Sequence, residues 1–212
     1  MLTLSVRVAS GEAEDWSGQY KHLFPAMLRL ATDVDSFARQ LFVPLTMQTI
    51  HWLASGSSGA APAVSAMLDA ANDAVSNASH SGVRDFGARC LGEFIRYAIK
   101  GQRPDSRDSP LAISNLLTRI YGLAQHPSAT QRLGFAFALN APEVYRELRN
   151  DPQTLDVHLF ELFRQTFLAL RLAQHVSGLA CFRQPHTQSM HTPTIAARVT
   201  CAIFRTRLHS AV

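Results

Sequence analysis

The feature that most limits the possible folds of this chain is the spacing of its apolar residues, which repeats at helical intervals between short breaks. One such set recurs three or four residues apart: Ile113, Leu116, Leu117, Ile120 and Leu123. That spacing places its members on one face of an α-helix. Sustained period-2 alternation and Asn-Gly or Asp-Gly hairpin turns, the usual marks of β-strands, do not occur. We therefore predict an all-α protein.

Breaks rich in Gly, Ser and Pro divide the pattern into successive helices. The predicted helices cover residues 16–31, 33–53, 62–75, 82–100, 113–125, 128–140, 142–149 and 152–175. Asp33 and Ser128 are the predicted N-caps of the second and sixth helices. Pro44 falls inside the second helix, where a proline should produce a kink. We expect residues 16–176 to form one helical-repeat segment, with an extension at 1–15 and a basic tail at 177–212.

Two further apolar sets recur at helical spacing, the first on one shared face and the second expected to point inward. In the second helix, four apolar residues recur at spacings of three and four: Val34, Phe37, Leu41 and Leu45. In the last helix, five residues are expected to point inward: Leu159, Leu162, Phe163, Phe167 and Leu170.

Two of the predicted helices resemble each other. SGVRDFGARCLGEF aligns with ATQRLGFAFALNAP, so that Arg84 matches Arg132 at an offset of 48 residues. HEAT-type helix pairs repeat at about 40–47 residues. Such a pair cannot bury its apolar face alone, and stacked pairs share a continuous core. The sequence therefore predicts a HEAT-like α-solenoid of antiparallel helix pairs, in which Arg84 and Arg132 bridge successive layers.

Catalytic motifs are not supported by their surroundings. Asp85-Phe86-Gly87 spells the metal-binding tripeptide of protein kinases, but the Gly-rich loop, the strand lysine and the HRD segment that a kinase needs are missing. The sequence also contains no G-x-S-x-G, Walker A, dinucleotide-binding or HExxH motif. We expect no catalytic residue and no cofactor, and Asp85-Phe86-Gly87 is interpreted as part of a helix.

A metal site is equally weakly indicated. Cys181, His186, His191 and Cys201 could supply four zinc ligands, but they lack the closely spaced pairs of a structural zinc site. The alternative is a tail that happens to contain these residues, and we predict no metal. The remaining candidates for an acid or base are interpreted as surface or capping residues: His51, His126 and His158.

Charge is balanced along the body of the chain. Four of the 20 Lys and Arg residues lie beyond residue 176, where there is no acidic residue, so the net charge of +4 comes from the tail. The candidate basic contact face consists of Arg89, Arg96, Lys100 and Arg103, whose separations are near multiples of a helical turn. It could contact a phosphate backbone or an acidic partner. Interleaved acidic residues favour the alternative of an ordinary solvated face.

Longer stretches resemble a known family. They are LFPAMLRLATDVDSFARQLFVPLTMQTIHWL (23–53), VRDFGARCLGEFIRYAIK (83–100), SPLAISNLLTRIYGLAQHPSATQRLGFAFALN (109–140) and VYREL (144–148). Together with the helix that follows, they are similar to the HEAT-repeat solenoid of the catalytic subunits of DNA-dependent protein kinases, in the phosphatidylinositol-3-kinase-like group.

The resemblance implies a role rather than an activity for this chain. Members of the family are nuclear serine/threonine kinases of non-homologous end joining, recruited to DNA ends by the Ku heterodimer, with the kinase domain near the far C-terminus. No catalytic residue of the family maps onto this sequence. The implied function is a scaffold segment whose partners are neighbouring solenoid repeats, and Ku and DNA through the parent assembly; no membrane partner is expected. A free-standing protein-binding adaptor is the alternative, and direct nucleic-acid binding is a third possibility.

A partial solenoid should leave apolar end faces that normally pack on neighbouring repeats. We therefore expect marginal solubility for the isolated chain.

Overall fold

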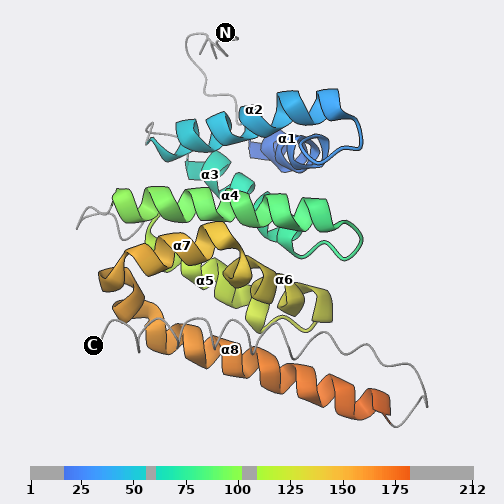
Figure 1. Ribbon diagram of the computed structural model, residues 1–212, viewed down its shortest axis with the longest axis vertical. Helices are drawn as coiled ribbons and strands as arrows, with labels where there is room; N and C mark the ends of the chain where they lie inside the picture. Colours follow the sequence, from blue (N-terminus) through green and yellow to red (C-terminus); the bar gives the residue numbers. More distant parts are fainter. Residues whose placement is uncertain (1–16, 56–60, 102–108, 182–212) are drawn as a thin grey trace.

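The computed structural model describes residues 17–55, 61–101 and 109–181, and all the regular structure in these ranges is helical (Figure 1). The helices are α1 (Ser17–Leu30), α2 (Ser36–Ala54), α3 (Ala61–Val75), α4 (Ser81–Lys100), α5 (Ile113–Ala124), α6 (Ala129–Asn140), α7 (Pro142–Asn150) and α8 (Pro152–Cys181). Each predicted helix is present, with bounds within a few residues of those expected, except that α8 continues to Cys181. The predicted tail at 177–212 otherwise lies outside the described residues.

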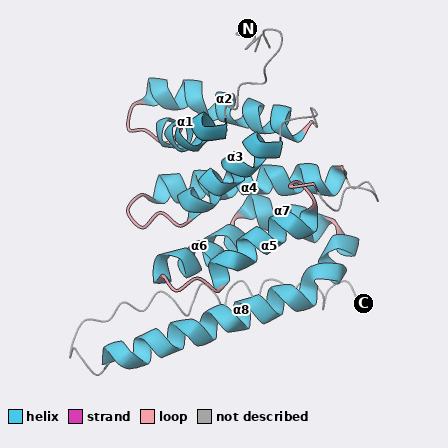
Figure 2. Cartoon of the chain, turned by 180° about the vertical axis from the view of Figure 1, so that it is seen from behind, coloured by secondary structure: helices cyan, strands magenta, loops and turns pink. Residues whose placement is uncertain are grey.

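The helices stack in layers along the long axis, with α1 and α2 at one end and α8 at the other (Figures 1 and 2). Within a layer, α1 pairs with α2, α3 with α4, and α5 with α6. Between layers, α1 packs on α3, α2 on α4, and α5 on α8. This arrangement confirms the predicted all-α solenoid.

The second helix of the third layer is broken in two. Helix α6 ends at Asn140, Ala141 is extended with φ −63° and ψ 130°, and α7 restarts at Pro142. A proline disfavours helical backbone in the residue before it but fits the first position of a helix. The break turns α7 across α4, on which it packs closely.

A continuous apolar core runs through the layers. Its most deeply buried large side chains include Ile50, Met67, Leu68, Phe94 and Leu117. Burying each such side chain stabilises the fold by roughly 1.5–3 kcal/mol. Two buried glycines of α4 bring neighbouring backbones unusually close, because an added Cβ would lie 2.8 Å from Ala74 Cβ at Gly87 and 2.6 Å from Glu143 Cβ at Gly92.

The same arginine contact recurs in the first three layers. Arg39, Arg84 and Arg132 are each the fourth residue of α2, α4 and α6. Each donates from Nη1 to two carbonyl oxygens of the turn before its helix, at 2.6 and 2.7 Å for Arg39 and at 2.8 and 2.7 Å for Arg132. For Arg84 the distances are 3.0 and 3.4 Å. We call this contact the arginine clamp; it supplies a donor to turn carbonyls that lie outside the helices.

The predicted role of these arginines is therefore only partly correct. Arg84 does reach the next layer, since its guanidinium lies 4.9 Å from the centre of the Phe137 ring. Its hydrogen bonds, however, stay within its own helix pair, and the same holds for Arg132. Sequence comparison matched Arg84 with Arg132 but missed Arg39, which lies 45 residues before Arg84 at the same position of its helix.

The predicted N-cap at Asp33 is wrong. Asp35 caps α2, because its side chain accepts a hydrogen bond from Phe37 N at 3.1 Å. Asp33 Oδ1 instead accepts from Asp35 N within the turn. Ser128 does occupy the N-cap position of α6, but its side chain makes no capping hydrogen bond. Helix α2 continues through Pro44 to Ala54.

The apolar residues that share a face at the second predicted helix are largely uncovered, and the inward face predicted for α8 is wrong in part. Val34, Phe37 and Leu41 are exposed, and so is Phe167 of α8. Leu45 is partly buried, and Leu162 is buried as expected. The residues of α2 that do enter the core lie on its opposite side: Thr46, Ile50 and Leu53. Helical spacing shows which residues share a face, but the neighbouring layer decides whether that face is covered.

Candidate interaction surfaces

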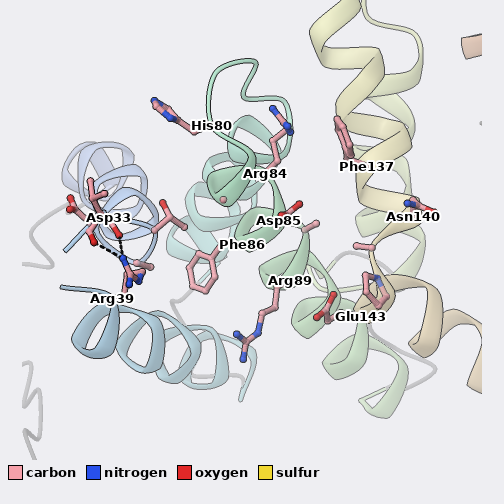
Figure 3. A pocket seen from close by; sticks show the side chains of 17 residues that line it. Asp33, Arg39, His80, Arg84, Asp85, Phe86, Arg89, Phe137, Asn140 and Glu143 are labelled. Carbon is pink, nitrogen blue, oxygen red and sulfur yellow. Dashed lines mark hydrogen bonds between the residues drawn. The ribbon is translucent and has the colours of Figure 1, made fainter. Parts of the chain in front are cut away.

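A groove of about 1030 Å³ lies along the edge of the stack where the helix-pair turns lie (Figure 3). Three segments far apart in the sequence line it: the α1–α2 turn with Arg39, the first half of α4, and the α6–α7 break. Its apolar floor includes Phe86, Phe137 and Pro142.

The polar groups of the groove carry both signs of charge. Arg39 and Arg84 are held in their arginine clamps, and the Arg84 Nε atom is buried without a partner among the described residues. Asp85, Arg89 and Glu143 make no hydrogen bond or ion pair with other described residues. Charges of opposite sign cancel at a distance, so the groove suits a mixed-charge protein surface better than a polyanion.

The predicted basic contact face lies partly on α4. Arg89 and Lys100 are exposed on this helix, but Arg103 lies outside the described residues. Arg96 forms an ion pair with Glu93, three residues earlier, and stacks 5.1 Å from the centre of the Tyr97 ring. One of the three described cations is therefore neutralised locally, and a contact role for this face stays a prediction.

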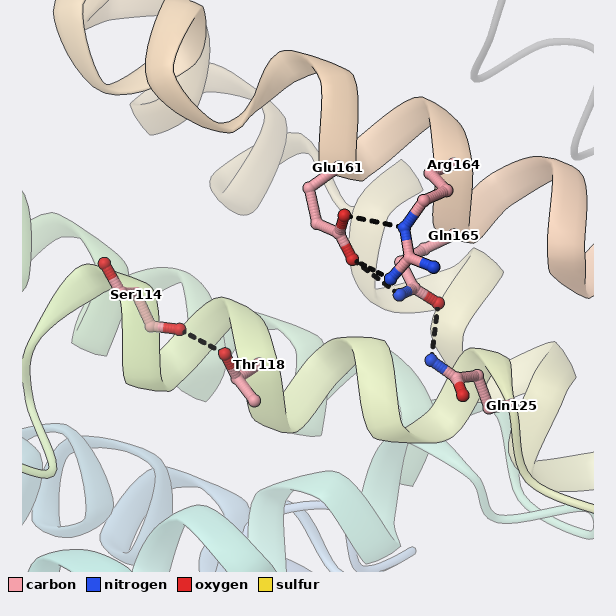
Figure 4. Close-up of polar contacts among 6 residues, drawn as sticks. All are labelled: Ser114, Thr118, Gln125, Glu161, Arg164 and Gln165. Atoms are coloured by element: carbon pink, nitrogen blue, oxygen red, sulfur yellow. Dashed lines mark hydrogen bonds and ion pairs between the residues drawn. The ribbon is translucent and has the colours of Figure 1, made fainter.

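Polar side chains also tie the first helices of successive pairs to one another. Arg119 of α5 donates to Ser65 Oγ of α3 at 2.7 Å and forms an ion pair with Asp69. One layer further, Nε2 of Gln125, the residue directly after α5, donates to Oε1 of the buried Gln165 of α8 at 3.0 Å (Figure 4). These links fix the register between layers, because each pairs one donor with one acceptor at a set height along the helices.

Glu161 completes the α5–α8 link. It accepts hydrogen bonds from Arg164 at 2.6 and 2.8 Å and from Gln165 Nε2 at 2.7 Å (Figure 4). These donors, Arg164 first, lower the pKa of the Glu161 carboxyl to about 2. The neighbouring Tyr121 hydroxyl is buried without a partner among the described residues, and burial raises its pKa.

The histidines take structural positions. His51 of α2 forms a hydrogen bond through Nδ1 with the Tyr97 hydroxyl of α4 and thus joins two layers. His126 Nδ1 accepts from Ser128 N at the start of α6. Burial lowers the pKa of the half-buried His158. Surface or capping positions were expected for all three, and none of them contacts a nucleophile in a hydrogen bond that the structure shows.

The kinase-like tripeptide has a packing role. Phe86 and Gly87 are buried within α4, and Gly87 lies against the backbone of α3.

The cysteines and possible metal ligands show no sign of a reactive site among the described residues. Burial raises the pKa of the Cys90 thiol to about 12, which suppresses the reactive thiolate. Of the four possible zinc ligands, Cys181 ends α8 with its side chain outside the description, and the other three lie beyond the described residues. Within the described ranges, His, Cys, Asp and Glu side chains form no group of three that could hold a metal ion.

None of the helices in the described ranges combines the length and the apolar character that crossing a membrane requires.

Comparison with known proteins gives one consistent result. The family model described as "DNA-dependent protein kinase catalytic subunit, CC1/2" matches residues 15–186. The DNA-dependent protein kinase catalytic subunit of Mus musculus is 39% identical over 155 residues, or 73% of this chain, and that of Gallus gallus is 39% identical over 143 residues, or 67%. The Dictyostelium discoideum protein of the same name is 31% identical over 179 residues, or 84%. The chain spans only 3–4% of the length of these relatives.

Proposed function

This chain belongs to the family of the DNA-dependent protein kinase catalytic subunit, and from that premise we propose that it is a non-catalytic scaffold segment of such a kinase. In this role it holds the spacing and curvature of the solenoid. The parent protein acts in the nucleus, in repair of DNA double-strand breaks by non-homologous end joining. The segment meets Ku and DNA ends through the parent assembly, and neighbouring repeats directly.

The observation that carries the proposal is the two-sided character of the end helices. Helix α2 has apolar side chains on two opposite sides, and so does α8, but described residues cover only the inner side of each. An apolar side that faces water is unfavourable by about 25 cal/mol per Å². Helices of this kind belong in the interior of a longer stack, where a neighbouring layer covers each side.

Two further observations support a structural role. The Asp-Phe-Gly tripeptide serves helix packing through Gly87, which lies too close to α3 to accommodate any side chain without a shift. The side chains of Arg119 and Gln125 form hydrogen bonds to neighbouring layers and thereby fix the helices relative to one another. Both features stabilise shape, which is the property a scaffold layer supplies.

The test is to place a charge on an outer face in the parent kinase. Phe160→Glu, on the uncovered side of α8, should destabilise the contact to the next layer and lower end joining in cells that lack the endogenous kinase. Phosphorylation of a free peptide should stay near the unsubstituted level, because the substitution is not in a kinase domain. Thr130→Glu is the matched control, since it adds the same charge at an exposed first-turn position of α6. Equal end joining for both variants would contradict the scaffold role.

A free-standing adaptor is the alternative, and the groove lined by α4 is the observation that favours it. Sequencing the transcript through and beyond the codon for His175 separates the two. A reading frame that continues into further helical repeats and a kinase domain supports the scaffold segment. A transcript that confirms the tail and stops after Val212 favours the adaptor and removes the kinase from the description.

A further inference from the structure

The groove along the edge of the stack carries charges of opposite sign on its two sides (Figure 3). Arg39 and Arg89 lie on the α2 side, Asp85 and Glu143 lie on the α6 side, and Phe86 lies between them. We propose that this groove binds a protein segment in which an apolar side chain stands between an acidic and a basic one. The proposal names the class of partner that the adaptor alternative leaves open, and it does not depend on the scaffold role.

The groove lies between layers rather than at an end of the stack. Its walls come from the turn between α1 and α2, from the first half of α4, and from the break between α6 and α7. A layer added to either end of the stack packs on α2 or α8 rather than on this edge. The groove is therefore a surface of the chain whether or not further repeats precede or follow it.

The charged side chains of the groove are free to meet a partner. Asp85 and Arg89 are exposed and four residues apart on α4, a spacing at which opposite charges often pair. The structure shows no ion pair between them, and in Figure 3 the guanidinium of Arg89 points toward α2 whereas Asp85 points toward α6. Glu143 is partly exposed and likewise forms no ion pair among the described residues. Both signs of charge are therefore available, each on its own side.

Each side also has one residue of the opposite sign, which is already hydrogen-bonded. On the α2 side, Asp33 Oδ1 accepts from Asp35 N at 3.0 Å. On the α6 side, Arg84 donates to two carbonyls of the turn before α4 and lies 4.9 Å from the centre of the Phe137 ring. Arg39 makes its two clamp bonds through Nη1 alone, which leaves Nη2 for a partner. The α2 side therefore favours an acidic group, and the α6 side favours a basic one.

This arrangement distinguishes between classes of partner. A nucleic acid is negative along its whole length, so it would meet the carboxylates of Asp85 and Glu143. A purely basic peptide would meet the arginines of the α2 side in the same way. Sites for small molecules occupy about 300–1,000 Å³, so a groove of about 1030 Å³ has room for a segment of several residues. The apolar floor around Phe86 supplies the contact for an uncharged side chain between the two charges.

The geometry of α4 limits the spacing of these charges in the partner. Asp85 and Arg89 are about 6 Å apart along the helix axis, and the helix is about 10 Å wide. Because the two side chains point to opposite sides, the groups that they bind are separated by about 6–12 Å. An extended chain advances about 3.3 Å per residue. The acidic and basic residues of the partner should therefore lie about two to four positions apart.

The test begins with a phage library of random twelve-residue peptides, selected on the immobilised full chain of 212 residues. Counter-selection on Asp85→Lys removes peptides that bind elsewhere, including on the uncovered sides of α2 and α8. The peptides that remain should share an apolar residue between an acidic and a basic residue that are two to four positions apart.

The affinity of a selected peptide is then measured by fluorescence anisotropy. Asp85→Lys and Arg89→Glu should each weaken binding by roughly threefold to thirtyfold, because a surface ion pair is replaced by a repulsion of similar size. Lys100→Glu is the matched control for Arg89→Glu, since it reverses the same charge at an exposed position of α4 outside the groove. It should leave the affinity unchanged. A peptide whose basic residue is exchanged for an acidic one should regain binding to Asp85→Lys, a recovery that an unfolded variant could not show.

Other outcomes overturn the proposal. A selection that yields no binder shows that the groove recognises no such segment, and one that yields only acidic peptides indicates a polyanion instead. Equal affinity for Arg89→Glu and Lys100→Glu shows that the peptide binds outside the groove. Each of these results leaves the scaffold role standing, because the end-joining assay with Phe160→Glu tests that role separately.

Discussion

Replacing Gly92 by alanine should loosen the contact between α4 and α7. A Cβ at this position would lie 2.6 Å from Glu143 Cβ, and 3.2 Å from both Glu143 C and Val144 N. Two of these three atoms belong to the α7 backbone, so a change of rotamer cannot relieve the clash. Helix α7 has to move by roughly 1 Å to restore ordinary contact distances of about 3.5–4 Å.

The size of the effect follows from what α7 buries. Val144 is 0% exposed and Leu148 is 7% exposed, and each contributes roughly 1.5–3 kcal/mol when fully buried. A gap of about 0.5–1 Å forfeits a quarter to a half of the contact energy, which amounts to about 1–3 kcal/mol for the two residues together. Replacing a glycine by alanine inside a helix stabilises the helix by about 1 kcal/mol. The net loss in the free energy of unfolding is therefore about 0–2 kcal/mol.

The matched control separates these two contributions. Gly122 lies in α5 with no atom within 4 Å of an added Cβ, so Gly122→Ala should gain about 0.5–1 kcal/mol from helix propensity alone. In urea unfolding followed by circular dichroism, Gly92→Ala should be less stable than Gly122→Ala by about 1–3 kcal/mol. Hydrogen exchange at the Val144 and Leu148 amides should accelerate only in Gly92→Ala. Equal stabilisation by both substitutions would refute the close packing of α4 on α7.

Three other predictions test separate contacts. Arg132→Ala removes an arginine clamp and should lower the free energy of unfolding in urea by about 1–3 kcal/mol, because two turn carbonyls lose their donor. The control is Arg146→Ala, at an exposed position, which should change this free energy by no more than about 0.5 kcal/mol. The pKa of the Glu161 carboxyl in the folded chain, about 2, lies below its ordinary value of 4.5, so the contribution of Glu161 to the stability of the fold is present above pH 4.5 and is lost as the pH falls toward 2. The difference in unfolding free energy between the unsubstituted chain and Glu161→Gln should therefore shrink between pH 4.5 and pH 2. A difference that does not depend on pH would contradict the lowered pKa. If the predicted basic face contacts DNA phosphates, the combined Arg89→Glu and Lys100→Glu substitutions should weaken DNA binding by the parent kinase. The slope of log binding constant against log salt concentration should become less steep by about 2. An unchanged slope would show that this face makes no phosphate contact.

Local sequence signals predicted the helices well because the residues that determine where a helix begins and ends lie next to those ends in the sequence. Proline, glycine and serine mark the breaks, and the apolar spacing between them is read over only a few turns. The N-cap of α2 shows the limit of that precision. Asp33 and Asp35 are both suitable residues before the same helix, and only the hydrogen bond to Phe37 N distinguishes them.

Features that depend on neighbours were not predictable in the same way. The spacing of Phe37 and Leu41 is that of a core face, yet no layer covers this side of α2 among the described residues. The groove was also missed, because it combines residues near 33, 85 and 140 that no local pattern connects. The ion pair between Glu93 and Arg96 could have been predicted from the sequence, because an acidic residue three positions before a basic one on a helix commonly pairs with it.

The arginine clamp has a consequence for how proteins of this kind change in length during evolution. It ties the turn inside each of the first three helix pairs to a fixed position of the following helix, so an inserted residue there would break two hydrogen bonds at once. Insertions and deletions should therefore be rare in these turns, and each pair with its turn should be inherited as an indivisible unit of constant length.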